Sequence, residues 1–304
     1  MENSPETITI YVLCHKHIQQ ALRAVRSIVN QEDNPFEVEI NLMVNTNSLT
    51  FLQEVKDSYE GEVLHSWSNG ATGAGKNACI RDWVSYDNSR WMMIVDGDDW
   101  LYPYALWHIA QVVEREPNMD YLGLQSMDML YSTAGSGRQQ ISKKPELYMA
   151  TWDARQENLT ELYPRKLWMK DLVKRHSVAR IMLMKRDAFV QYSPEDMLMY
   201  EDMVVNAELL CKSVEGSVNF QTINCSGIYI ADATVKGMSE TNIYKYDHQT
   251  PYEYHVRPLV ERYGNLNYAM LPFMKIHRHP TVTMLNKITY LIKTYNYGVL
   301  QQRK

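Results

Sequence analysis

Short apolar runs alternate with amphipathic stretches through the first hundred residues. The runs are too short for helix cores, and we predict strands at residues 8–13, 37–44, 62–65 and 91–95. Between them, apolar side chains recur at helical spacing within residues 18–29, 51–55 and 78–84. Strands that alternate with helices in this way predict an α/β fold, with a mostly parallel sheet that is covered by helices on both faces.

Each predicted strand is followed by a polar segment. The four segments are CHKH (residues 14–17), NTNS (45–48), SNGATGAGKN (68–77) and DGDD (96–99). Because parallel sheets bind ligands at the carboxyl ends of their strands, we expect these segments to converge on one site.

The DGDD segment crowds the carboxylates of Asp96, Asp98 and Asp99 into four residues. Their mutual repulsion is tolerable only if solvent or a cation neutralises the negative charge. Mg²⁺ or Mn²⁺ held by one or two carboxylates usually completes its coordination with water and phosphate oxygens, so the segment predicts a metal and a phosphate-bearing ligand. The alternative is an acidic turn that caps the helix opened by Pro103.

The glycine-rich segment GATGAGKN (residues 70–77) fits the pattern G-x-x-x-x-G-K of a phosphate-binding loop. It has Asn77 where that loop needs a Ser or Thr hydroxyl for Mg²⁺, and it follows a third strand. An NTP hydrolase or kinase therefore remains only a minor alternative.

Composition and cysteine spacing indicate a globular protein of a reducing compartment. The 304 residues are 45% hydrophobic, without a signal-like N-terminus or an apolar run of transmembrane length. The four cysteines, Cys14, Cys79, Cys211 and Cys225, lack CxxC spacing, which is typical of free thiols. We expect a soluble, cytoplasmic protein.

Charge is distributed unevenly along the chain. The net charge of -5 combines residues 138–186 (twelve Lys or Arg against five acids) and residues 262–304 (seven against none) with a remainder that carries -19. Solvated charged faces explain such segments, and so does a polyanionic partner or an anionic surface.

These motifs resemble those of the family 2 glycosyltransferases, which have the GT-A fold. The similar segments are ITIYVLCHKH (residues 8–17) with SIVNQ (27–31), NGATGAGKNACI (69–80), and MMIVDGDDWLYPYAL (92–106), which matches the family's hhhhDxDDxxxPxxL. The resemblance covers residues 8 to about 130. Leu13 stands where the family usually has Pro, and Asn45 and Thr46 stand where it commonly has aspartates.

The resemblance implies a nucleotide-diphosphate sugar as donor, with a UDP-sugar as the expected one. The implied donor-binding residues are Cys14, His15, Asn45, Lys76, Asn77 and Asp96. It also implies that Asp98, together with Asp96, binds the Mn²⁺ or Mg²⁺ that bridges the diphosphate. Asp99 is a weaker candidate, because capping the next helix explains it equally well.

Two later segments also resemble the family. MYEDMVVNAELL (residues 199–210) is similar to its ED motif, which implies that Asp202 is the catalytic base, with Glu201 as the alternative; two acids at a helix start are the bland explanation. IYIADATVKGMSE (228–240) resembles the closing segment and leaves a third metal ligand near Asp232 and Ala233 open. The pair His277 and His279 lacks a third ligand and is interpreted as structural.

We predict three parts in the chain. Residues 1–130 form the nucleotide-sugar-binding half of a GT-A domain, 131–250 the half that binds the acceptor and carries the base, and 251–304 a smaller, mainly helical, basic and Tyr-rich segment. That last segment suits a DNA backbone, an anionic membrane, or packing against the second half.

Together these observations predict an inverting, metal-dependent glycosyltransferase. The favoured acceptor is a hydroxymethylated pyrimidine in DNA, bound through residues 138–186 and 262–304; this resembles phage DNA modification and implies the host cytoplasm if the protein is phage-encoded. One alternative is transfer to a cell-surface polysaccharide or lipid-linked glycan beside an anionic membrane. Another is a non-enzymatic module that binds nucleotide sugars or nucleic acid.

Overall fold

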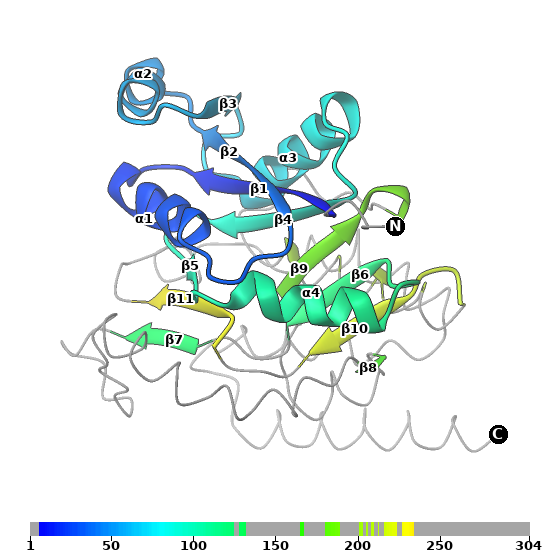
Figure 1. Ribbon diagram of the computed structural model, residues 1–304. Helices are drawn as coiled ribbons and strands as arrows, with labels where there is room; N and C mark the ends of the chain where they lie inside the picture. Colours follow the sequence, from blue (N-terminus) through cyan, green and yellow to red (C-terminus); the bar gives the residue numbers. More distant parts are fainter. Residues whose placement is uncertain are drawn as a thin grey trace, which may run out of the picture.

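The computed structural model describes residues 6–124, 128–131, 165–166, 180–188, 201–202, 205, 208–209, 212, 216–223 and 227–233. Eight strands form its main sheet (Figure 1): β1 (Thr7–Cys14), β2 (Glu37–Asn45), β3 (Glu62–Ser66), β4 (Trp91–Asp96), β6 (Tyr121–Leu124), β8 (Arg165–Lys166), β9 (Arg180–Lys185) and β10 (Phe220–Ile223). Their order is β3-β2-β1-β4-β9-β6-β10-β8.

The first four strands are parallel, as the alternation of strands and helices predicts. β1 pairs in parallel with β2 and with β4, and β2 pairs in parallel with β3. The carboxyl ends of these strands therefore meet at one edge of the sheet. β9 lies antiparallel between β4 and β6, so the sheet is mostly parallel rather than entirely so. Strands from both sides of residue 130 thus belong to one sheet; the predicted boundaries at 130 and 250 stay predictions.

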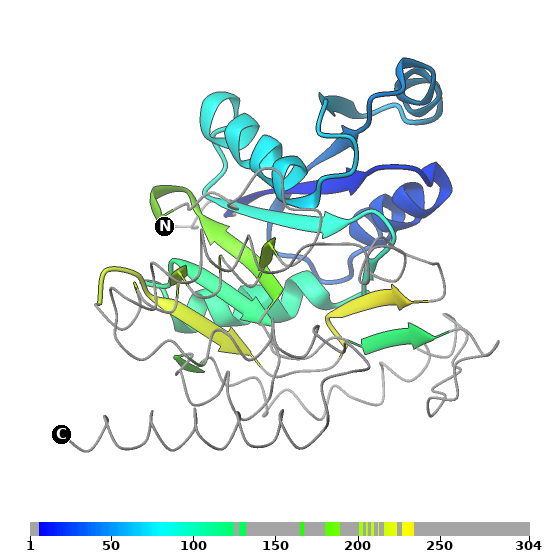
Figure 2. The ribbon, with the colours of Figure 1, turned by 180° about the vertical axis from the view of Figure 1, so that it is seen from behind.

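Helices cover both faces of this sheet, which confirms the prediction. One hydrophobic cluster joins Ile8, Ile10 and Val12 of β1 to the buried faces of α1 (Ile18–Val29), α2 (Leu49–Ser58) and α4 (Ala105–Arg115). The alternate residues of β1, Tyr11 and Leu13, pack in a second cluster with α3 (Thr72–Tyr86), Val205 and Leu209. α1 and α4 lie in front of the sheet in Figure 1, whereas Figure 2 shows the face that carries α3.

α3 begins six residues earlier than the helical pattern predicts, so residues 72–77 are helix and not loop. The chain turns before the helix at Asn69 and Gly70, whose φ angles are 46° and 85°. A Cβ at Gly75 would lie 2.7 Å from Asn45 Nδ2 and 2.9 Å from Leu13 Cδ1, so glycine lets this end of the helix approach the strands closely. The phosphate-loop interpretation is thereby weakened, because Lys76 lies inside a helix.

A second, three-stranded sheet joins distant parts of the chain. It consists of β5 (Trp100–Leu101), β11 (Tyr229–Ala233) and β7 (Asp128–Tyr131), with β11 antiparallel to β5 and parallel to β7. β11 comes from the segment that resembles the family's closing motif. Because β11 pairs with β5, this segment lies directly beside the residues that follow the DGDD turn.

Several predictions fall largely outside the described residues. These include the acceptor region 131–176, the tail 251–304 with His277 and His279, and the thiols of Cys211 and Cys225. The two described cysteines, Cys14 and Cys79, are buried free thiols. Among the helices that are described, none is long and apolar enough to cross a bilayer.

Candidate active site

The DGDD turn is held tightly against the end of β1. Asp96 is the last residue of β4, and the Gly97 N–H donates to the Leu13 carbonyl at 2.9 Å. A Cβ at Gly97 would lie 2.6 Å from that oxygen, so no other residue fits without a backbone shift. The Asp99 N–H donates to the Asp96 carbonyl at 2.9 Å and closes the turn. Asp96 and Asp98 are both partly exposed at this edge of the sheet.

Asp99 fastens this turn to β11. Its side chain is buried; Oδ2 accepts from the Tyr229 hydroxyl at 2.7 Å and Oδ1 from the Asp232 N–H at 3.0 Å. The same hydroxyl accepts from the Asp96 N–H at 3.2 Å. The interpretation of Asp99 as a helix cap is wrong, since the N-cap of α4 is Tyr104 and carries no side-chain cap.

Arg23 of α1 supports the turn from the other side, and no sequence motif indicated it. Its Nη2 donates to the Asp98 carbonyl at 2.5 Å and to Asp232 Oδ2 at 2.9 Å, while its guanidinium lies 3.9 Å from the centre of the Trp100 ring. Asp232, left open as a third metal ligand, thus forms an ion pair with arginine.

Asp96 and Asp98 fit a hard divalent cation. Within the described part of the chain, no group of three or more His, Cys, Asp or Glu side chains lies close enough together to hold a metal ion. Two carboxylates are what Mg²⁺ or Mn²⁺ typically takes from a protein when water and substrate phosphates complete its coordination. The donor set therefore suits a metal that binds together with a phosphate-bearing ligand.

A lysine and two carboxylates form a second cluster. Lys76 Nζ donates to Glu201 Oε1 at 2.7 Å and to Asp202 Oδ1 at 2.8 Å. The Lys76 and Glu201 side chains are 4% and 6% exposed, whereas that of Asp202 is 35% exposed. Adjacent carboxylates therefore have different surroundings, because one is buried against α3 and the other reaches the surface.

Electrostatics connect this cluster to the DGDD turn. Burial raises the pKa of Glu201, the charge of Lys76 opposes that rise, and the negative charges of Asp202 and Asp96 add to it. The Asp96 carboxylate thus adds to the negative electrostatic environment of the buried glutamate. The sequence prediction placed Lys76 beside the nucleotide; the structure shows its contacts with Glu201 and Asp202, residues 125 and 126 positions further along the chain.

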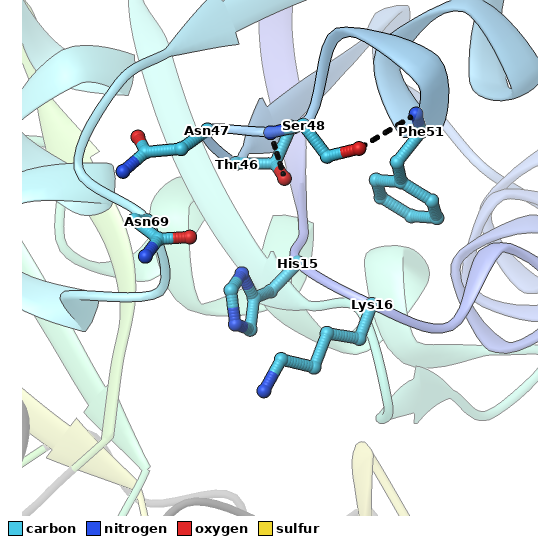
Figure 3. Close-up of a pocket in the computed structure, with 7 residues that line it drawn as sticks. All are labelled: His15, Lys16, Thr46, Asn47, Ser48, Phe51 and Asn69. Atoms are coloured by element: carbon cyan, nitrogen blue, oxygen red, sulfur yellow. Dashed lines mark hydrogen bonds between the residues drawn. The ribbon is translucent and has the colours of Figure 1, made fainter.

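An open pocket of about 510 Å³ lies at the carboxyl ends of β1 and β2 (Figure 3). Its lining residues are His15, Lys16, Thr46, Asn47, Ser48, Phe51 and Asn69. His15 Nδ1 lies 2.6 Å from the Asn45 carbonyl, and burial lowers the His15 pKa. The ring is therefore neutral at pH 7, so Nδ1–H donates to the carbonyl and Nε2 is an acceptor.

Three other predicted donor-binding residues are buried and do not line this pocket. The buried Asn45 amide accepts from Ser68 Oγ at 2.5 Å and from the Gly70 N–H at 3.0 Å, and it donates to the Ala71 carbonyl at 3.1 Å. This favours a positioning role over direct contact with a base. The Cys14 side chain is buried in the core, which raises its pKa to about 12, so its thiol does not line the pocket. Asn77 is likewise buried.

The four strand-end segments therefore meet, as their positions in the sequence predict. Gly97 lies against Leu13 and Cys14, His15 contacts Asn45, and Asn45 contacts Gly70. An acidic turn, a pocket and a lysine–carboxylate cluster share one edge of the sheet.

Solved structures of similar fold were found, although no protein-family model and no curated protein matches the sequence. S. aureus TarS 1–349 in complex with UDP-GlcNAc has a TM-score of 0.58 at 13% identity, covering 95% of this chain and 81% of that one. GalNAc-T7 with UDP, GalNAc and Mn²⁺ has a TM-score of 0.54 at 12% identity, covering 97% of this chain and 55% of that one. The chain has the GT-A fold. It spans 44% of the longer TarS structure.

Proposed function

We propose that this protein is an inverting, metal-dependent glycosyltransferase that moves a sugar from a nucleotide-diphosphate sugar to an acceptor hydroxyl. The observation that carries the proposal is the partly exposed Asp202 carboxylate, held by Lys76 of α3 in a GT-A fold that also carries the acidic turn. A binding module would need a pocket, but it would not need a positioned base next to a pair of metal-binding carboxylates.

The donor is proposed to be a UDP-sugar. The pocket of about 510 Å³ is large enough for a nucleoside, and it offers both hydrogen-bonding groups and the ring of Phe51. Structures of similar fold hold UDP or UDP-GlcNAc. We assign His15, Lys16 and Thr46 to this nucleoside end of the donor and Asp96 to its ribose or its metal.

Asp98, together with Asp96, would hold Mn²⁺ or Mg²⁺. Bound there, the cation supplies positive charge that offsets the negative charge developing on the departing diphosphate. The Arg23 and Tyr229 contacts keep the two carboxylates in place, because they fix the backbone on both sides of them.

Asp202 is proposed to act as general base in a single displacement. It takes the proton of the acceptor hydroxyl; the acceptor oxygen forms a bond to the anomeric carbon, and the electron pair of the breaking bond leaves with the diphosphate oxygen. One displacement inverts the anomeric configuration. Glu201 is too deeply buried to reach an acceptor and acts as a support for Lys76.

We propose a hydroxymethylated pyrimidine in DNA as acceptor. The support is the charge of residues 138–186 and 262–304, each +7 against a remainder of -19, although most of these residues lie outside the described part of the chain. The negative phosphates of a DNA backbone bind such positively charged segments. A nucleobase that is flipped out of the duplex would bring its hydroxymethyl group to Asp202, the general base. A phage origin and the host cytoplasm fit this acceptor; a membrane-bound or polysaccharide acceptor is the second candidate, supported by the same charge.

The test begins with nucleotide sugars. Each is added with and without Mn²⁺, and thermal unfolding is followed; a UDP-sugar should raise the melting temperature only with the metal, because binding to the native state alone stabilises it. The best donor is then incubated with hydroxymethylated and unmodified duplex DNA, and transfer is measured. Substitution of Lys275, Arg278 or Lys287 should weaken DNA binding alike for all sequences. Salt-insensitive DNA binding combined with sedimentation on anionic liposomes would replace DNA with the membrane-glycan acceptor.

A further inference from the structure

We propose that Lys76 is the positioning residue for the catalytic base, anchoring the Asp202 carboxylate to the buried Glu201 carboxylate through one shared ammonium group. This inference rests on the proposed function and adds a residue role to it. Lys76 touches neither reacting atom in this assignment; it acts through Asp202.

The geometry supports the role directly. One nitrogen lies 2.7 Å from Glu201 Oε1 and 2.8 Å from Asp202 Oδ1, so the lysine bridges two consecutive side chains of one helical segment. Two of its three N–H bonds are thereby directed at fixed acceptors. Because the Glu201 side chain is only 6% exposed, it is held in place by the surrounding protein and gives Lys76 a fixed partner.

The charges explain why both carboxylates are needed. A lone ionised Glu201 at this depth would be strongly disfavoured, and Lys76 supplies the opposite charge that permits it. Lys76 therefore lies between a buried and a partly exposed carboxylate, and its positive charge favours the ionised form of both.

The location of Lys76 ties the base to the donor half of the site. Lys76 lies in the second turn of α3, whose start is fixed by Asn45, Gly70 and Gly75 at the back of the nucleotide pocket. Asp202 is helical, and the nearby residues Val205 and Leu209 pack in the cluster that contains Cys79 and Trp83 of α3. The bridge therefore sets the distance between the base and the donor.

The decisive comparison is Lys76→Met, Lys76→Arg and the control Lys212→Met. Lys212 forms an ion pair of the same 2.7 Å length with Glu208, but this pair lies on the surface at 34% and 30% exposure. We expect Lys76→Met to lower kcat about 10- to 100-fold with little change in the KM for the nucleotide sugar, because a displaced base slows chemistry and not donor binding. Lys76→Arg should lose less, since it keeps the charge and its donors. Lys212→Met should match the wild type.

If Lys76→Met raised the KM for the donor and left kcat unchanged, the proposal would be overturned, and Lys76 would instead have a role in binding the nucleotide. A second measurement needs no substrate and covers a variant that folds poorly. In a double-mutant cycle by thermal unfolding, Lys76→Met combined with Glu201→Gln should be more stable than Lys76→Met alone, because the unpaired buried carboxylate is removed. Additive effects in that cycle would overturn the anchoring of Glu201. An inactive wild-type protein would instead overturn the proposed function, so the two failures are distinguishable.

Discussion

The hydroxyl of Tyr229 donates to Asp99 Oδ2 at 2.7 Å, joining residues that are 130 positions apart. The same oxygen accepts from the Asp96 N–H, so one side chain of β11 holds both ends of the acidic turn. The carboxylates assigned to the metal are thus oriented by a neighbour that binds no metal itself.

Tyr229→Phe should lower the free energy of unfolding by about 1–2 kcal/mol, because it removes the hydrogen bonds that the Tyr229 hydroxyl makes with the buried Asp99 carboxylate and with the Asp96 N–H. It should also weaken Mn²⁺-dependent UDP binding. Urea unfolding and calorimetric titration measure the two effects. Tyr59→Phe is the control: its hydroxyl donates to the Ile40 carbonyl, far from the acidic turn, and its loss should leave UDP binding unchanged. Equal affinity for UDP in both variants would mean that Tyr229 does not help to position the metal-binding carboxylates.

Asp98→Asn and Asp99→Asn should separate metal binding from structure. Asp98→Asn is expected to abolish transfer and Mn²⁺-dependent UDP binding while the melting temperature stays close to that of the wild type. Asp99→Asn should lower the melting temperature clearly, because one of its two engaged acceptor oxygens becomes an amide. Full transfer activity in an excess of chelator would refute the metal assignment altogether.

Asp202→Asn should lower kcat by about 10² to 10⁴-fold, the usual contribution of a general base. The affinity for the nucleotide sugar should remain nearly intact, since the base acts on the acceptor. Single-turnover kinetics and equilibrium titration of the donor give the two numbers. If the variant kept more than about a tenth of wild-type kcat, Asp202 would not be the general base.

Stability should fall between pH 6.5 and about pH 4 because of His108. Burial in α4 lowers its pKa from 6.5 to about 4. In this window His108 is protonated in the unfolded chain but stays neutral in the folded protein. The stability that the neutral His108 contributes is therefore complete above pH 6.5 and is lost as the pH falls towards 4. The loss at pH 5 is about 2 kcal/mol by linkage.

The measurement is urea unfolding of wild type and His108→Gln at pH 7 and pH 5. The substitution is expected to lower stability at both values, so the informative quantity is the change between them. That change should be smaller in the variant by about 2 kcal/mol. Identical pH dependence in the two proteins would mean that folding does not lower the pKa of His108.

The sequence alone determined the parallel half of the fold and the edge on which the site lies. Residues 8–13 and 91–95 are mostly apolar because they are buried on both faces, and this requirement is local enough to be read from each segment. The polar groups at their ends follow from the same logic, since parallel strands bring their carboxyl ends together. The start of α3 was misjudged because its first turns contain two glycines, which are poor helix formers in isolation.

Tertiary structure alone decided the partners of the charged residues. Arg23, on the polar face of α1, reaches Asp232, and Lys76 reaches Glu201 and Asp202; each pair joins positions more than a hundred residues apart. Asp99 was assigned by its neighbours in sequence to a helix cap, yet it accepts from Tyr229. Hydrophobic periodicity records which face of an element is buried, because that depends on residues three or four positions apart. Which cation meets which carboxylate depends on how whole elements pack, and no local pattern carries that information.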